Sequence, residues 1–420
     1  MRTELSPSTP DVSRRDLTLD LARVTAVCFV VVVHLLQVGV GRGPDGAIVT
    51  SRPAEIQPWF DTATWFGQIM PLFFVVGGFA SAAGWATWTS RGGDARGFIR
   101  SRALRLAQPA LPLFLVVAAV LVVAALVGVD PSLVDAAVVG VGMPLWFLAA
   151  YLLCQAVVPL TTHWHEVAPR RTVAMLLVAV IAVDALRFAS GVQELGYVNL
   201  LFVWPLIQQL GYWYRDGWFD RRSSLSLLGL AAGSYLVVGA IVVWGPYSNN
   251  MLANLNPPTL PLVLFGLAQA CLLRLAKPLL TALMRTKAAQ AVVFVIGSRL
   301  MTVYLWHLPV ILIVSGVALL IPGAAPTPAS PEWWATRPLV FAATAVVLWL
   351  LSLVLVRFEA LGELPPPPGA VVLAIAWVCA FLPPFAVTLE GMNTVLAVSG
   401  AVLYAVSVIL LRAGRRRAAP

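Results

Sequence analysis

Long apolar stretches separated by short polar segments run along almost the whole chain. Each stretch has about 20 residues, which is the length that an α-helix needs to cross a bilayer. The pattern predicts twelve membrane spans, near residues 17–40, 66–89, 109–129, 144–161, 171–189, 196–214, 225–244, 259–276, 300–321, 337–357, 370–388 and 394–412. We therefore expect an all-α polytopic transmembrane bundle of about 10–12 spans.

The same pattern predicts the domain organisation. Residues 17–412 form one membrane-embedded domain between an N-terminal tail (1–16) and a basic C-terminal tail (413–420). The apolar run from Ala288 to Ile321 would be about 51 Å long as one helix, which exceeds the thickness of a bilayer. We expect it to bend at Gly297 and Ser298.

Composition excludes a water-soluble protein, because 60% of the residues are hydrophobic and only 11% are charged. If both termini face the cytoplasm, 22 Lys and Arg residues lie on the inner side and four on the outer side. This bias predicts a multi-pass protein of the cell (cytoplasmic) membrane with both termini inside. It also accounts for most of the net charge of +9, so no nucleic-acid partner is implied.

Metal-ligand spacing is weak throughout the sequence. The four cysteines lie singly within apolar runs, where they are typical of packing residues. His163 and His165 form an HxH pair beside Glu166, and we expect these histidines to be solvated on a cytoplasmic loop. The sequence therefore predicts no metal site.

Ionisable residues in the first span need a partner or a role, since an isolated charge in lipid costs at least about 2.5 kcal/mol. Asp20 and Arg23 are three residues apart and can pair on one helical face. His34 follows Arg23 by eleven residues, about 1100° of rotation, so these two also share a face. The group could be a structural polar seam. Alternatively, His34 acts as a base that takes a proton from an alcohol, or forms an acyl-imidazole.

Five arginines precede the third span, namely Arg91, Arg96, Arg100, Arg102 and Arg105. The positive-inside rule alone predicts some of them. Guanidinium groups also bind phosphate in bidentate fashion, which would suit a phosphorylated donor such as coenzyme A.

Three other groups of side chains suggest packing or binding. Tyr304 and His307 are neighbours on one helical face beside Pro309, as either packing or substrate-orienting residues. Small residues in the second span, from Pro71 to Gly84, predict close approach of another helix. Trp146 and other aromatic residues fall near span ends, where membrane anchoring is the preferred interpretation and glycan stacking the alternative; the others are Phe147, Trp204, Tyr212, Trp213 and Tyr214.

Several of these residues together resemble the acyltransferase-3 family of membrane proteins, which O-acylate glycans and other acceptors. The resemblance is colinear over most of residues 15–360. It rests on the Arg23-to-His34 spacing, the FF-x-x-x-G-F element from Phe73 to Phe79, the R-x-x-R pair Arg102 and Arg105, LWFL at Leu145–Leu148 and YLWHLPV at Tyr304–Val310. One position departs from the family, because Gly77 stands where serine is frequent.

The resemblance implies a stand-alone O-acyltransferase that moves an acyl group, by family habit acetyl, from cytoplasmic acyl-CoA to a hydroxyl. Arg102 and Arg105 would engage acyl-CoA, and His34 would assist transfer with Arg23 and Asp20 beside it. Tyr304, His307 and Trp146 are the expected substrate-binding residues. A surface polysaccharide, a glycolipid, a peptidoglycan sugar or a secreted metabolite is compatible as acceptor.

Two other functions use the same polar residues. A transporter or flippase of a glycan or lipid-linked substrate would use the polar face of the first span as a permeation path. A non-catalytic scaffold would tolerate changes at both His34 and Arg105.

Overall fold

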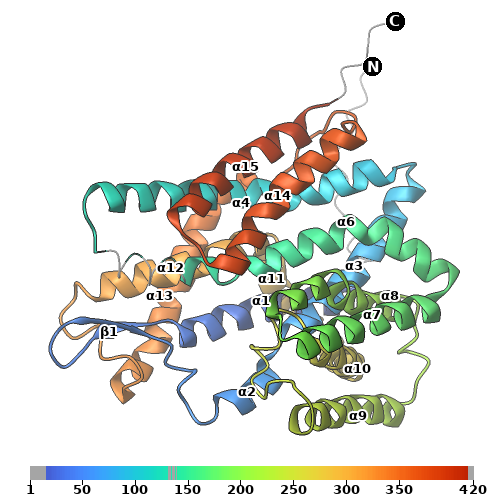
Figure 1. Cartoon of the computed structure of the whole chain (residues 1–420), viewed down its shortest axis with the longest axis horizontal. Coiled ribbons are helices and arrows are strands. Elements are labelled where there is room, and N and C mark those ends of the chain that lie inside the picture. Colours follow the sequence, from blue (N-terminus) through green and yellow to red (C-terminus); the bar gives the residue numbers. More distant parts are fainter. Residues whose placement is uncertain (1–15, 131–133, 135–137, 139, 415–420) are drawn as a thin grey trace, which may run out of the picture.

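A computed structural model describes residues 16–414 except 131–133, 135–137 and 139, so most of both predicted tails lies outside the described residues. Helices dominate this part of the chain (Figure 1). In chain order the elements are α1 (Leu17–Gln37), β1 (Gly39–Arg42), β2 (Ile48–Ser51), α2 (Phe60–Gly67), α3 (Met70–Ser90), α4 (Ala95–Leu126), α6 (Leu145–Val167), α7 (Pro169–Ser190), η2 (Gln193–Leu201), α8 (Val203–Arg215), α9 (Ser224–Val243), α10 (Leu260–Leu283), α11 (Lys287–Gly297), α12 (Leu300–Ala318), α13 (Pro331–Leu355), η3 (Val356–Phe358), α14 (Ala370–Glu390) and α15 (Thr394–Arg412).

Eleven helices in the described residues are long and apolar enough to cross a membrane, which confirms the predicted class of fold. The prediction of a span at 196–214 is wrong. That segment is a short 3-10 helix, η2, followed by the 13-residue helix α8. At 1.5 Å per residue α8 is about 20 Å long, less than the thickness of the hydrocarbon core. Its side chains are almost all buried among neighbouring helices instead.

The long apolar run before residue 321 breaks where the sequence predicts. α11 ends at Gly297 and α12 begins at Leu300. Glu359 stabilises the new helix start, because its carboxylate accepts hydrogen bonds from the backbone N–H (3.0 Å) and the hydroxyl of Thr302. Burial raises the pKa of the Glu359 carboxyl above its ordinary value.

Close approach of α3 and α8 depends on glycine. A Cβ at Gly78 would lie 2.3 Å from the backbone oxygen of Gln208, and one at Gly211 would lie 2.1 Å from that of Val75. The two backbones therefore touch with no side chain between them, which confirms the close packing predicted for the small residues of the second span.

The last two helices pack on α4 (Figure 1). Phe114 of α4 contacts the ring of Tyr404, and the Ser407 hydroxyl donates to the Ala376 carbonyl oxygen at 2.7 Å. The buried Arg100 side chain donates to the carbonyl oxygens of Leu411 and Pro365. This arginine is thus bound to the C-terminal part of the fold and is withdrawn from the cluster predicted to bind phosphate.

His163 and His165 are not on a loop, so that prediction is wrong. Both belong to the last turns of α6, and only His163 is exposed. His165 is 6% exposed, and its Nδ1 and Nε2 atoms lie 2.7 Å from Gln209 Oε1 and 2.9 Å from Asp216 Oδ2. Gln209 donates through Nε2 to the Thr161 carbonyl, which fixes its oxygen towards the ring. Both ring nitrogens therefore lie within hydrogen-bond distance of side-chain oxygens, and the His165 ring joins α6 to α8.

We predict that Gly78→Ala lowers the free energy of unfolding by about 1–3 kcal/mol, because the added Cβ forces the α3 and α8 backbones apart. Thermal unfolding of the purified protein in detergent measures this. Gly233→Ala in α9 is the matched control, since nothing lies within 4 Å of its added Cβ. Equal melting temperatures for the two variants would contradict the packing argument.

His165→Ala is expected to lower the free energy of unfolding by about 1.5–3 kcal/mol, because it leaves the buried amide of Gln209 and the Asp216 carboxylate without this hydrogen-bond partner. The exposed neighbour supplies the control, and His163→Ala should change stability by less than about 0.5 kcal/mol. Thermal unfolding of both variants at pH 7 is the measurement, and similar losses in both would refute the assigned contacts.

Candidate functional site

A cavity of about 150 Å³ runs along one face of α1 and is closed by residues from α3, α6 and α12 and from the segment before α10. Five of the predicted site residues line it: Arg23, His34, Trp146, Tyr304 and His307. The spacing argument for α1 is therefore correct in its geometry, because Arg23 and His34 face the same space. Of the residues that line the cavity, Arg23 alone carries a formal charge.

His34 and His307 contact each other directly. The Nδ1 atom of His34 lies 2.7 Å from Nε2 of His307, although 273 residues separate them in sequence. The ring planes are 7° apart and the centroids are 5.0 Å apart. In rings stacked face to face the nearest atoms are about 3.5 Å apart or more, whereas these two nitrogens are only 2.7 Å apart. The two rings therefore lie edge to edge in nearly one plane. A nitrogen lone pair points in the ring plane, and the arrangement is therefore a hydrogen bond.

The surroundings of His307 decide which way this hydrogen bond runs. His307 is fully buried, and its Nδ1 lies 2.7 Å from the Tyr304 carbonyl oxygen and 3.1 Å from that of Val303. Carbonyl oxygens only accept, so Nδ1 of His307 carries a proton and, in the neutral ring, Nε2 does not. His34 must then donate through Nδ1. The remaining nitrogen of His34, Nε2, has no hydrogen-bond partner among the described residues, so its lone pair is free, as a general base requires.

Arg23 lies between this cavity and a second one of about 520 Å³, which we call the vestibule. The vestibule lies between the start of α1 and α11, and its polar lining residues are Asp20, Arg23, Lys287, Gln290 and Ser298. Asp20 and Arg23 pair as predicted, with 4.0 Å between Oδ1 and Nη1. Arg23 and Leu300 line both spaces, so the two cavities meet at these side chains.

Arg102 and Arg105 line neither space. Both lie in the first turns of α4, which begins at Ala95 and not at the predicted residue 109. The Arg102 guanidinium packs over the Phe98 ring and is close enough to Arg23 and Arg105 for mutual repulsion. Its Nε atom is buried without a hydrogen-bond partner in the described residues, whereas Arg105 is exposed. An unpaired, partly buried cation among other cations favours an anionic ligand.

Most of the aromatic residues predicted to anchor the protein at the membrane surface are buried inside it instead. Trp146 is 9% exposed and Trp204 is fully buried, with their ring centroids 5.5 Å apart. Tyr212 and Tyr214 are also buried, so the interfacial interpretation is wrong for these four residues. Trp146 forms part of the cavity wall. The Tyr304 hydroxyl donates to the Pro144 carbonyl oxygen at 2.6 Å and so fixes α12 against α6.

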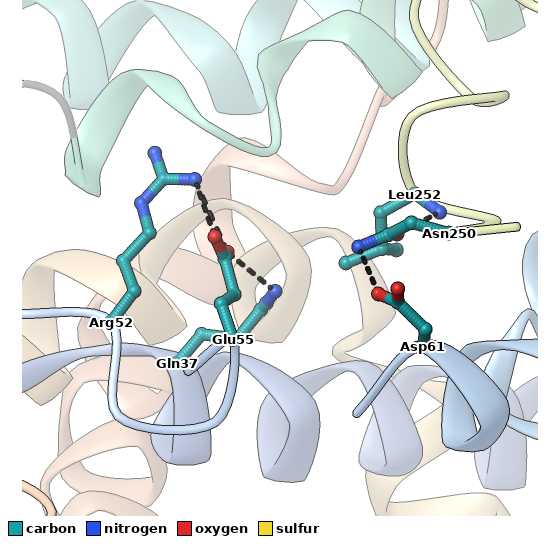
Figure 2. Close-up of polar contacts among 6 residues, drawn as sticks. All are labelled: Gln37, Arg52, Glu55, Asp61, Asn250 and Leu252. Atoms are coloured by element: carbon teal, nitrogen blue, oxygen red, sulfur yellow. Dashed lines mark hydrogen bonds and ion pairs between the residues drawn. The ribbon is translucent and has the colours of Figure 1, made fainter. Parts of the chain in front are cut away.

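Two groups of polar contacts include Gln37 and Leu252, which both line the cavity (Figure 2). Gln37 donates through Nε2 to Glu55 Oε1 (3.2 Å), and Arg52 pairs with the same carboxylate. Beside them, Asn250 donates to Asp61 Oδ1 and accepts from the backbone N–H of Leu252, both at 2.9 Å. These contacts hold the segment after β2 and the segment before α10 against α1 and α2.

The sequence analysis treated His34 and His307 as separate sites and did not select Gln37 or Gln68, which line the same cavity. No local signal joins His34 to His307, because their contact depends on how α1 and α12 pack. Gln37 could have been found from its spacing. It follows Arg23 by fourteen residues, about 1400° of rotation, so it lies within about 40° of the same helical face.

Comparison with known proteins agrees with this geometry. An acyltransferase-domain family model, that of the acyltransferase-3 proteins, matches residues 16–356. This range includes the cavity and the vestibule and ends before α14 and α15. No curated protein and no solved structure gives a match. The chain belongs to the acyltransferase-3 family of membrane acyltransferases.

Proposed function

We propose that the protein transfers an acyl group, acetyl by family habit, from cytoplasmic acyl-CoA to a hydroxyl of a glycan, glycolipid or secreted metabolite. One observation carries the proposal, namely the direction of the hydrogen bond from His34 to His307. It leaves Nε2 of His34 as an unprotonated nitrogen on a ring held in one orientation beside a cavity. General-base catalysis of acyl transfer needs such a nitrogen.

In the proposed reaction the acceptor hydroxyl oxygen attacks the thioester carbonyl carbon. The ester C–O bond forms, the C–S bond breaks, and the hydroxyl proton moves to Nε2 of His34. His34 then carries a positive charge, which its Nδ1–H shares with the lone pair of His307. The proton passes to the departing thiolate, so the products are an ester and free coenzyme A. His307 is thus a positioning residue for His34, comparable to the third member of a catalytic triad.

The donor would enter from the side of the α1 N-terminus, which the positive-inside rule places in the cytoplasm. The vestibule has room for part of a large donor and carries Lys287 and Arg23. Arg102 and Arg105, on the neighbouring start of α4, would bind the phosphate groups of acyl-CoA. The thioester would then pass Arg23 into the cavity that holds His34.

His34→Ala is expected to lower kcat about 10²- to 10⁴-fold, because it removes the proposed general base. The measurement is coenzyme A release by purified protein supplied with acetyl-CoA and a hydroxyl acceptor. His163→Ala, an exposed histidine of α6, is the control.

His307→Ala extends the same test, since it removes the acceptor that orients His34. It should lower kcat while acyl-CoA affinity is retained. Wild-type turnover in His34→Ala would exclude the base role. Substrate flux across vesicles without coenzyme A release would favour a transporter that uses the same two neighbouring cavities.

Arg102→Ala should raise the KM for acyl-CoA about 10-fold or more with little change in kcat, because it removes charge-assisted hydrogen bonds to phosphate. Initial rates at varied acetyl-CoA concentration test this. Arg96→Ala is the matched control, since the exposed Arg96 pairs with Asp94 in the same segment. Equal KM values for both variants would place the phosphate groups elsewhere.

A further inference from the structure

Gln37 and Gln68 lie at the end of the cavity beyond His34, and both are deeply buried. Gln37 is 4% exposed and ends α1, while Gln68 is 2% exposed and lies between α2 and α3. Both line the cavity, together with the loop residues Leu252 and Leu255. Gln37 is one helical turn beyond His34 on the same face, about 4.5 Å further along the axis.

The partners of the two amides fix their orientation. Gln37 Nε2 faces a carboxylate oxygen of Glu55 at 3.2 Å, and Gln68 Nε2 faces the Met251 carbonyl oxygen at 3.2 Å. Both partners only accept hydrogen bonds, so the atom that faces each of them has to be the NH₂ group. The Oε1 atoms of Gln37 and Gln68 have no hydrogen-bond partner in the described residues and are not enclosed by protein.

Contacts behind the two glutamines hold them in place. Arg52 pairs with Glu55, which holds the carboxylate against Gln37 (Figure 2). The Thr64 hydroxyl accepts from the Met251 backbone N–H at 2.9 Å, and the Gln68 backbone oxygen accepts from Gln269 Nε2 at 2.6 Å. Hydrogen bonds therefore hold both glutamine side chains, and with them the two amide oxygens, in fixed positions. Such support is typical of a binding site and unusual for surface glutamines.

We propose that Gln37 and Gln68 form the acceptor subsite of the enzyme and select an uncharged acceptor with several hydroxyl groups, of the sugar class. This inference rests on the proposed acyl transfer. Two free amide oxygens accept hydrogen bonds, so they fit hydroxyl donors next to the hydroxyl that His34 deprotonates. Trp146 and Phe73 on the cavity wall offer flat apolar surfaces for a sugar ring. Among the described residues that line the cavity Arg23 is the one with a formal charge, so the lining at the glutamine end offers a charged acceptor no ion-pair partner.

Octyl β-glucoside and 1-octanol are matched probes of this subsite, since they share the alkyl chain and differ in the sugar. Purified protein with acetyl-CoA should acetylate the glucoside at least about 10-fold more efficiently than the alcohol. The double variant Gln37→Met, Gln68→Met should lose this preference through a rise of about 10- to 100-fold in the KM for the glucoside, with an unchanged KM for acetyl-CoA.

Gln57→Met is the control, because the Gln57 amide binds the Pro53 carbonyl in the same loop and does not line the cavity. A double variant that keeps the wild-type preference overturns the subsite. If the double variant does not fold, the comparison of the two probes with the wild-type protein is the test. Equal acetylation of the glucoside and the alcohol by the wild type overturns the proposal.

Saturation-transfer NMR with octyl β-glucoside, without acetyl-CoA, separates this inference from the proposed function. Binding that the double variant loses, in a protein that releases no coenzyme A, would support the subsite and refute acyl transfer. Acyl transfer with glucoside binding unaffected by the double variant would refute the subsite alone.

Discussion

The hydrogen bond between the His34 and His307 rings is the interaction on which the rest of the site depends. In an apolar surrounding each polar atom needs a partner, and the Tyr304 carbonyl supplies one for the far side of His307. That contact sets the protonation of His307, which in turn sets the protonation of His34. A backbone oxygen on α12 therefore determines which nitrogen of His34 is free to accept a proton.

α1 carries four polar residues of the two cavities along one face. Asp20 and Arg23 lie where the vestibule meets the cavity, His34 lies further along, and Gln37 ends the helix. Because one face of one helix bears all four, their order along the axis is fixed by the helical rise. The packing of the other helices determines only which residues these four side chains contact.

Rigid packing around this line keeps its geometry. The glycine contact of α3 with α8 and the internal cluster of Trp146 and Trp204 leave α3 and α6 little freedom to move relative to each other. Asp184 of α7 adds a polar tie, since it accepts from the Tyr247 hydroxyl and from the backbone N–H of Leu260 at the start of α10. Catalytic positions need such support, because small displacements weaken hydrogen bonds to reacting groups.

The sequence by itself determined the class of fold, most helix boundaries, the break near Gly297 and the shared face of Arg23 and His34, because each follows from local composition or helical period. The motif residues also sufficed to identify the family. Tertiary structure alone determined the pairing of His34 with His307 and the burial of His165 and Trp146. It also determined that Arg100 is separated from Arg102 and Arg105. Each of these depends on contacts between helices distant in sequence, and a periodic pattern shows which face a residue lies on but not which neighbour covers it.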